Sequence, residues 1–268
     1  MRIMLIFHDK NKTVDAENNM NTTREKAEAE RIVNAFESFE NDNHATIVQR
    51  LLAVSPYASM HEDVNNFALE KFTNIILIPF HKRPDTACEW TDEKLEHKLV
   101  NQNLLTISPC SIGLLVDHGL NSFPKSQKGI QECRVAMLFV GGPDDLEALA
   151  YAWRMAGTPH LILTLVRFVP RKDVSELIEN VEEEIFTIMC EREKHKQLDD
   201  DYINMFRFRI MHDQSIAYIE EQVNGGDQIV SAINSAYNDF DLYVVGRGNG
   251  RASTLTVGLS NWSDSPKL

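Results

Sequence analysis

The glycine-rich loop at residues 246–250 is the part of this sequence whose spacing is best suited to binding a charged ligand. Gly246, Gly248 and Gly250 follow a short apolar run and precede a segment that begins as a helix. Because glycine has no side chain, the backbone N–H groups of such a loop can approach a phosphate closely. The same spacing is also typical of a tight turn between a strand and a helix, which needs glycine for positive φ angles. Both interpretations place the loop at the end of a strand.

A basic cluster, His81, Lys82 and Arg83, directly follows another apolar run at residues 74–79. Ligands of α/β proteins bind at the carboxyl ends of strands, so this cluster is a candidate site for an anion or an acidic partner surface. His61 stands beside two acids in the first turn of a predicted helix, where we expect its pKa to be raised. An unperturbed imidazole titrates near pH ~6.5, which makes His61 and His81, together with Lys82, candidates for pH sensing. A solvated loop with ordinary surface histidines is the alternative.

Residues arranged for catalysis are missing from the sequence. It contains no G-x-S-x-G elbow, H-E-x-x-H pair or complete Walker loop. The dinucleotide fingerprint G-x-G-x-x-G is incomplete as well, because Arg251 stands where its third glycine would be. The four cysteines are too dispersed for a zinc ligand pair and too few for a disulfide framework. They are Cys88, Cys110, Cys133 and Cys190. We therefore expect neither an enzyme nor a metal site.

Short apolar runs alternate with helix-period segments along the chain, which is the pattern of parallel strands joined by crossover helices. Several runs are β-branched and almost free of charge, as expected of strands that are covered on both faces. The predicted strands are residues 3–7, 45–52, 74–79, 112–116, 134–140, 161–169, 215–221 and 241–245. The sequence therefore predicts an α/β fold with mostly parallel sheets.

Helix starts are marked between these strands. Thr22 with Glu25, and Ser59 with Glu62, have the spacing of a capping box, in which the two side chains satisfy backbone donors of the first turn. After the strand at residues 134–140, two glycines and a proline precede three acids, which complement the dipole of the following helix and repel phosphate. These acids are Asp144, Asp145 and Glu147.

The segment at residues 119–130 is rich in Gly, Ser, Pro and Lys and lies between two predicted strands, so we interpret it as a linker between domains. The elements on its two sides follow a similar order, which indicates an internal repeat. The predicted domains are residues 1–118 and 132–268, joined by residues 119–131. In this comparison the first domain lacks an opening strand and helix and the second lacks its last strand, so we expect a chain clipped at both ends.

Residues 171–201 hold 11 acids against five bases, a net charge of −6. Because this stretch falls between a predicted strand and a later helical segment, we expect an exposed acidic insertion. Docking of the insertion on a basic partner is the alternative to a solvated loop.

Composition and charge limit the partners of the chain. Of its 268 residues, 43% are hydrophobic and 25% are charged, which is typical of a globular protein. The formal net charge of −13 repels phosphate backbones and anionic membrane surfaces, so we expect no nucleic-acid partner. The longest stretch without a charged side chain, residues 99–116, carries several amides and a proline, and is not predicted to cross a membrane.

Six segments carry a resemblance to a known family. They include RVAMLFVGGPDDLEALAYAWRMAGTP at residues 134–159 and DLYVVGRGNGRASTLTVGLSNWSDSPKL at residues 241–268, and the others are residues 53–64, 75–83, 99–120 and 163–170. Together they resemble the cytosolic C-terminal region of plant monovalent cation/proton exchangers, the CHX group of the cation/proton antiporters. In that family the region follows a multi-pass transport domain and is similar to two tandem universal-stress-protein-like folds of the HUP/Rossmann-like type.

This resemblance implies a cytosolic regulatory region of a potassium-type cation/proton antiporter, which modulates transport and pH homeostasis without containing the ion pathway. The implied partner is the transmembrane transport domain of the same protein, at the cytosolic face of an endomembrane or the plasma membrane. Pairing of the domains into a homodimer is a second expectation. The alternative is a free-standing nucleotide-binding universal stress protein.

In nucleotide-binding universal stress proteins a similar loop is spaced Gly-x₂-Gly-x₉-Gly-Ser/Thr, and this sequence keeps that pattern only in part. Gly248 follows Gly246 after one residue rather than two, and Ser260 comes one place late. If an adenine nucleotide binds, the resemblance places it here, through Gly246, Gly248, Gly250, Arg251 and Ser260.

Overall fold

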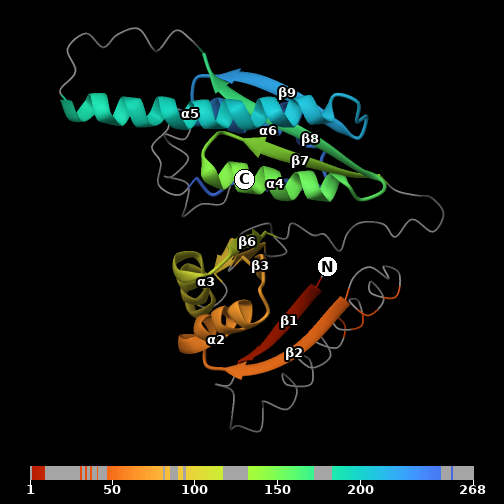
Figure 1. Cartoon of the computed structure of the whole chain (residues 1–268). Helices are drawn as coiled ribbons and strands as arrows, with labels where there is room; N and C mark the ends of the chain where they lie inside the picture. Colours follow the sequence, from red (N-terminus) through yellow and green to blue (C-terminus); the bar gives the residue numbers. More distant parts are fainter. Residues whose placement is uncertain are drawn as a thin grey trace. The chain divides into compact units, whose positions relative to one another are not determined.

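The computed structural model describes residues 2–9, 31, 34, 37, 41, 47–80, 82–84, 90–92, 95–116, 132–171, 183–248 and 255 (Figure 1). The chain divides into two compact units, residues 1–124 and 125–268. This division falls inside the predicted linker at residues 119–131, which lies outside the described residues.

The first unit consists of parallel strand pairs and helices. Its elements are β1 (Arg2–Asp9), β2 (Ile47–Ser55), α2 (Tyr57–Glu70), β3 (Ile75–Pro79), β4 (Lys82–Pro84), β5 (Trp90–Asp92), α3 (Leu95–Ile107) and β6 (Ser111–Leu115). β1 pairs in parallel with β2, and β3 pairs in parallel with β6. The short antiparallel ribbon of β4 and β5 was not predicted, because three-residue strands carry no periodicity to detect.

Helices α2 and α3 pack against each other, and polar contacts join them. Ser108 Oγ donates a hydrogen bond to Asn65 Oδ1 at 2.8 Å. The Nε2 atom of His97 lies 2.9 Å from the hydroxyl of Tyr57, and the two rings meet edge to face. These contacts join elements that are about forty residues apart in the chain.

Helix α2 begins earlier than predicted. Its first residue is Tyr57, and the backbone N–H of Ser59 donates to the carbonyl of Pro56. Ser59 therefore lies inside the first turn, and the predicted capping box of Ser59 and Glu62 is wrong. The fixed φ of Pro56 suits the entry into a helix, which explains the earlier start. The other predicted capping box, at Thr22, lies outside the described residues.

The second unit is a single parallel sheet with helices on both faces. Its elements are β7 (Cys133–Phe139), α4 (Pro143–Ala156), β8 (Leu161–Pro170), α5 (Glu183–Ile210), β9 (Ile216–Val223), α6 (Gly226–Ala236) and β10 (Leu242–Val245). The strands lie in the order β10-β7-β8-β9, and every neighbouring pair is parallel. The predicted α/β fold with parallel sheets is confirmed, and each predicted strand corresponds to an observed one.

Alternate residues of the central strands face opposite layers, as the period of two in a strand requires. Val135, Met137 and Phe139 of β7 pack with residues of α4 and α5. Ala136 and Leu138 of the same strand pack with α6 on the other face. Figure 1 shows α4 and α5 in front of the sheet and α6 behind it. Both faces of the central strands are therefore buried.

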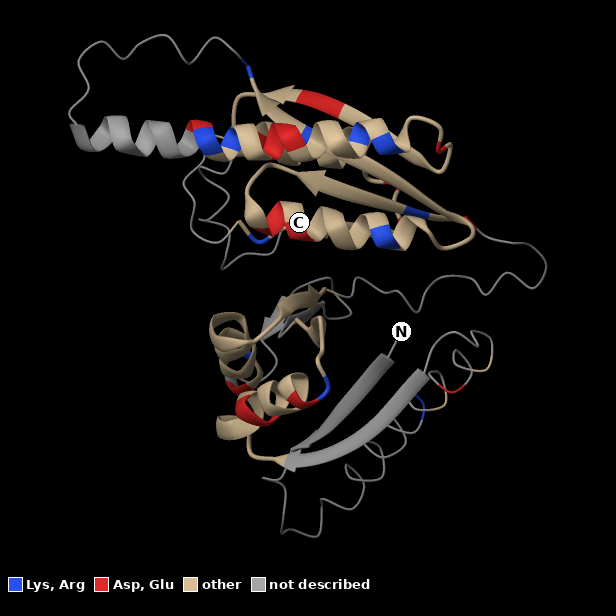
Figure 2. Ribbon diagram, in the orientation of Figure 1, with Lys and Arg blue, Asp and Glu red and all other residues tan. Residues whose placement is uncertain are grey.

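Helix α5 corrects the prediction of an exposed acidic insertion at residues 171–201. The 28-residue helix Glu183–Ile210 starts inside that stretch and covers the sheet. Asp199, Ile203, Phe206 and Ile210 share one face and are buried. The net charge concealed this helical spacing, because acidic and basic residues lie along the described part of the helix (Figure 2), with Glu193 and Asp201 exposed. Residues 172–182 lie outside the described residues.

Phe206 gives a direct test of this core. It is 0% exposed and meets the ring of Trp153 edge to face at 5.1 Å, whereas Phe208 on the same helix is 75% exposed. We expect Phe206→Ala to lower the free energy of unfolding by about 3–5 kcal/mol, because it leaves a cavity in a packed layer. The control Phe208→Ala should change it by less than about 0.5 kcal/mol. Urea unfolding followed by circular dichroism measures both, and similar small effects would contradict the packing described here.

Candidate functional site

The candidate site lies where the carboxyl ends of β7 and β10 meet. In this strand order the chain leaves β7 in one direction to form β8 and returns to its other side with β10, which makes the β7/β10 boundary the switch point of the sheet. Val245 pairs with Leu138, so the turns that follow the two strands are neighbours. Ligands of doubly wound α/β folds bind in this crevice.

A buried carboxylate occupies this position. Asp145, in the first turn of α4, is only 3% exposed. Its Oδ2 atom accepts hydrogen bonds from the N–H groups of Val140 and Gly141, each at 2.7 Å. Its Oδ1 atom accepts one from the N–H of Gly246 at 2.8 Å. One side chain therefore joins the turn after β7 to the turn after β10.

A second carboxylate reaches the same turn from α5. The Oδ2 atom of Asp199 accepts the N–H of Gly142 at 3.0 Å. Gly141 and Gly142 have φ angles of 121° and 102°, a region that favours glycine, and so aim their N–H groups at the two acids. The turn between β7 and α4 is thus held between side chains from two different helices.

Burial raises the pKa of Asp145 from 3.8 to about 6. The three N–H groups that it accepts lower the pKa in part, and the nearby charge of Asp199 raises it further. Burial likewise raises the pKa of Asp199, while the Gly142 N–H and the charge of Arg167 lower it. Asp145 therefore changes its charge within about one pH unit of neutrality, although a free aspartate would not.

Gly246 is required by close packing. A Cβ atom at this position would lie 2.5 Å from the backbone nitrogen of Asp145 and 2.6 Å from the carbonyl carbon of Asp144. Gly248 has a φ of 72°, which agrees with the tight-turn interpretation of the glycine loop. The remaining predicted nucleotide-binding residues, Gly250, Arg251 and Ser260, lie outside the described residues.

The geometry argues against a phosphate at Gly246, because the N–H group that it would need is already donated to Asp145. Asp145 takes the place that an anionic ligand would occupy at a switch point. From the sequence, Asp145 was expected only to complement the helix dipole. An acid at the third helical position was a usable signal, since such residues often bond back to the preceding turn. Asp199 was missed because its helix was taken for a loop.

The predicted pH-sensing residues belong to the first unit. The Nδ1 atom of His61 lies 3.4 Å from the Nδ2 atom of Asn103, at the surface between α2 and α3. His81 lies outside the described residues, and Lys82 belongs to β4, where only the backbone is described. Sensing or anion binding by these residues stays a prediction.

The described part of the chain holds neither a metal-ligand cluster nor a membrane-spanning helix. Its histidines, cysteines, aspartates and glutamates form no group of three or more that could hold a metal ion. None of its helices combines the length and the apolar character needed to cross a membrane.

Comparison with protein families gives matches to both units. Residues 132–268 match the plant cation/H(+) antiporter C-terminal domain, and residues 1–120 match a plant cation/H(+) antiporter domain. This chain belongs to the plant cation/H(+) antiporter family. The two matched ranges leave out residues 121–131, which fall within the predicted linker.

Relatives from Arabidopsis thaliana match over most of this chain. Cation/H(+) antiporter 15 is 42% identical over 268 residues, covering 99% of the chain and 32% of the relative. Cation/H(+) antiporter 23, chloroplastic, is 44% identical, covering 91% of the chain and 28% of the relative. The chain therefore spans about a third of the length of the curated relatives it matches. Among solved structures, a universal stress protein from Archaeoglobus fulgidus is 13% identical with a TM-score of 0.41, covering 96% of this chain and 78% of that one.

Substitution of Gly246 tests the close approach of α4 to β10. We expect Gly246→Ala to lower the free energy of unfolding by about 3 kcal/mol, because the added Cβ would meet backbone atoms of α4 as well as the Asp145 carboxylate, and the backbone cannot move aside without shifting the helix. The matched control is Gly157→Ala at the end of the same helix. Gly157 has a φ of −71°, which alanine adopts freely, and its nearest contact would be 3.4 Å. Thermal unfolding measures both variants, and equal effects would contradict this role of Gly246.

The raised pKa of Asp145 predicts a pH-dependent stability. The folded state holds the proton more tightly than the unfolded chain, so this contribution is complete below pH 3.8 and is lost as the pH rises through about 6. The loss amounts to about 3 kcal/mol, since one pKa unit corresponds to about 1.4 kcal/mol. Asp145→Asn cannot ionise and should lack this slope.

The difference in unfolding free energy between wild type and Asp145→Asn isolates the effect, because other titrating groups cancel. Urea unfolding at intervals between pH 4 and 7.5 measures it. A difference that stays constant over this range would show that Asp145 does not titrate as described.

Proposed function

We propose that this chain is a cytosolic regulatory region of a monovalent cation (K⁺)/proton antiporter, in which it modulates transport and pH homeostasis. The family match supports the antiporter context, and the relatives are about three times as long as this chain. The transmembrane transport domain of the same protein is then its partner, and the ion pathway belongs to that domain. Pairing of two copies through these units is part of the proposal, and light scattering across a dilution series tests it.

The observation that carries a regulatory role is the carboxylate clamp at the switch point, which consists of Asp145 and Asp199 with the turn that they hold. Hydrogen bonds to an ionised carboxylate are roughly twice as strong as those to a neutral acceptor. Protonation of Asp145 weakens its bonds to the turns after β7 and β10, and it also removes the repulsion from Asp199. The clamp therefore has two protonation states, which differ in the strength of these hydrogen bonds and in the repulsion between the two acids.

Several charged groups surround the clamp. They are Asp200 and His195 on α5, Arg167 on β8 and Asp144 on α4. Arg167 makes an ion pair with Asp200, which leaves Asp199 with the N–H of Gly142 as its hydrogen-bond partner. The positive charges of Arg167 and His195 lower the pKa of Asp199 in part, whereas burial raises the pKa of Asp145 to about 6, so that Asp145 is the acid that titrates near neutrality.

A difference in how the two protonation states bind the transport domain would bias the transport equilibrium. We propose binding and regulation rather than catalysis for this chain, because both switch-point acids are engaged by backbone N–H groups. The proton that a cation/proton exchanger moves is also the signal that the clamp would detect. Regulation of this kind needs no nucleotide.

The full-length parent protein, reconstituted in lipid vesicles, tests this role. We expect Asp145→Asn to exchange cations for protons like wild type at pH 5, and to differ increasingly as the pH rises through about 6, where only the wild type becomes charged. A pH-sensitive dye inside the vesicles reports the exchange. The control Asp227→Asn removes an exposed acid from the first turn of α6 and should leave the pH profile unchanged.

Identical pH profiles for wild type and Asp145→Asn would refute sensing by the clamp, and a full-length parent without exchange would refute the antiporter role. The free-standing nucleotide-binding alternative has its own readout. ATP would then raise the melting temperature of the isolated chain, and Gly248→Val would abolish the rise. We expect no rise, because Gly246 donates its N–H to Asp145.

A further inference from the structure

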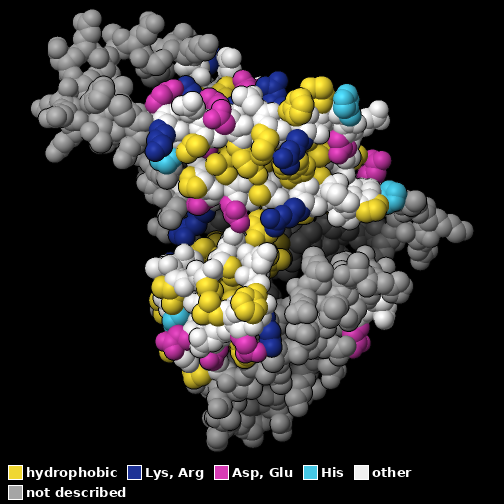
Figure 3. All heavy atoms as spheres, in the orientation of Figure 1, with side chains coloured by type: hydrophobic (Ala, Val, Ile, Leu, Met, Phe, Trp, Pro, Cys, Tyr) yellow, Lys and Arg dark blue, Asp and Glu magenta, His cyan; other side chains and the backbone are white. Residues whose placement is uncertain are grey.

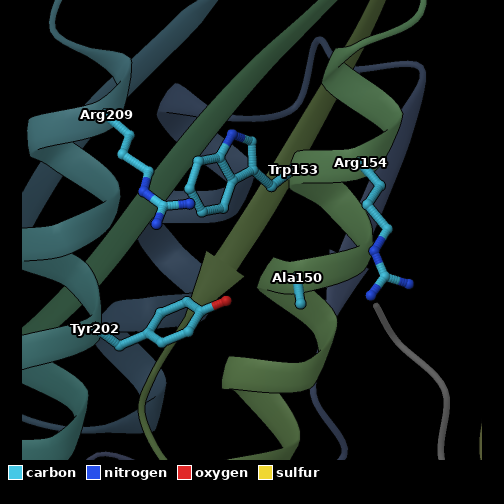
Figure 4. Close-up of a pocket in the computed structure, with 5 residues that line it drawn as sticks. All are labelled: Ala150, Trp153, Arg154, Tyr202 and Arg209. Atoms are coloured by element: carbon cyan, nitrogen blue, oxygen red, sulfur yellow. The ribbon is translucent and has the colours of Figure 1, made fainter.

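An open groove runs between α4 and α5 on the face of the second unit opposite to α6. It has a volume of about 320 Å³ and is lined by Ala150, Trp153, Arg154, Tyr202 and Arg209. Figure 4 shows Trp153 and Arg209 coming from opposite walls and lying side by side, the hydroxyl of Tyr202 directed toward α4 near Ala150, and Arg154 on the side of α4 away from α5. The groove is separate from the switch point and takes no part in the clamp.

Aromatic rings hold both arginines of the groove in place. The guanidinium of Arg209 lies 5.5 Å from the centre of the Trp153 ring, and that of Arg154 lies 5.2 Å from the centre of the Tyr151 ring. The edge-to-face contact of Trp153 with the buried Phe206 fixes the tryptophan. Arginine stacked on a ring keeps the N–H groups at its edge available for a planar acceptor.

Neither arginine forms an ion pair with any acid in the part of the chain that the structure describes. Arg134 and Arg167 of the same unit do, with Asp239 and Asp200, whereas Arg207 forms no ion pair with a described acid and stacks on Tyr218. The chain has a net charge of −13, so acids are available in excess. Two arginines therefore lie at one groove without a carboxylate partner among the described residues. We take this as a sign that their N–H groups bind an acceptor from elsewhere.

Next to the groove, α5 also exposes two apolar side chains. Leu198 is 50% exposed and Met205 is 39% exposed. They are seven residues apart, so they share a helix face with Tyr202 and Arg209. Figure 3 shows hydrophobic side chains gathered with Lys and Arg over the face that carries α4 and α5. From Leu198 to Arg209 this wall is about 16 Å long at 1.5 Å per residue, which is the length of three helical turns.

We propose that this groove is the docking site for an acidic amphipathic helix of a protein partner. Apolar residues of such a helix would cover Leu198 and Met205, and its carboxylates would accept N–H groups of Arg209 and Arg154 and the O–H of Tyr202. A groove open along its length suits a helix better than a small molecule, of which it would cover only one side. The inference concerns a different surface from the clamp and does not depend on the antiporter role.

Binding of a defined peptide to the purified 268-residue chain tests the proposal. The probe is a fluorescent 14-residue helix with leucine at positions i, i+3, i+4 and i+7 and glutamate elsewhere, followed by fluorescence anisotropy. We expect Arg154→Ala with Arg209→Ala to weaken binding by about tenfold or more, because two charge-assisted contacts are lost. The control Arg207→Ala removes the same kind of charge from α5. Arg207 stacks on Tyr218 instead, at 4.8 Å, so binding should be unchanged.

Circular dichroism of each variant shows whether a loss of binding comes from a loss of folding. Leu198→Glu is a second variant, which places a negative charge next to the groove and should repel the acidic peptide. Equal binding by wild type and the double variant would overturn the proposal. So would displacement of the peptide by millimolar inorganic phosphate, which would indicate a small-anion site. A dimer of this chain that the double variant dissociates would make the groove a contact between copies instead.

Discussion

An ionised carboxylate that is removed from water must be compensated by hydrogen bonds, and Asp145 finds that compensation only where the ends of β7 and β10 meet. The donors are backbone N–H groups of three residues, one of them 101 positions away in the chain. These N–H groups belong to turns, outside the helix and strand ladders, and would be unsatisfied if no acceptor reached them. The acid and the turns thus need each other, and the position of α4 against the sheet follows from that requirement.

The same constraint explains the glycines around the site. Gly141 and Gly142 have the φ angles that direct their N–H groups toward the two acids, and Gly246 leaves room for the backbone of α4. A phosphate-binding loop uses glycine for similar reasons, which is why the sequence alone left a ligand site and a tight turn as alternatives. The distinction lies in the acceptor, and here the described acceptor is a side chain of the protein.

The strands could be predicted because runs such as residues 161–169 are apolar, β-branched and free of acids, and burial on both faces of a parallel sheet demands that composition. The α/β fold and the family followed from these runs and from the quoted segments. Only the last part of helix α5 was predicted, because the net charge of −6 over residues 171–201 was interpreted as a solvated loop although the helix begins at Glu183. The clamp was missed for a different reason. Which turns meet at a switch point depends on strand order, and no local pattern records that order.

Strand β10 has four residues and, among the described strands, pairs only with β7. A short edge strand with one paired neighbour is the part of a sheet that detaches at the lowest free energy, and it does so without unfolding the rest of the sheet. The hydrogen bond from the N–H of Gly246 to Asp145 holds the carboxyl end of β10 to α4. The ionisation state of Asp145 therefore changes the free energy of local opening of β10, and with it how often the amides of this strand are exposed to solvent.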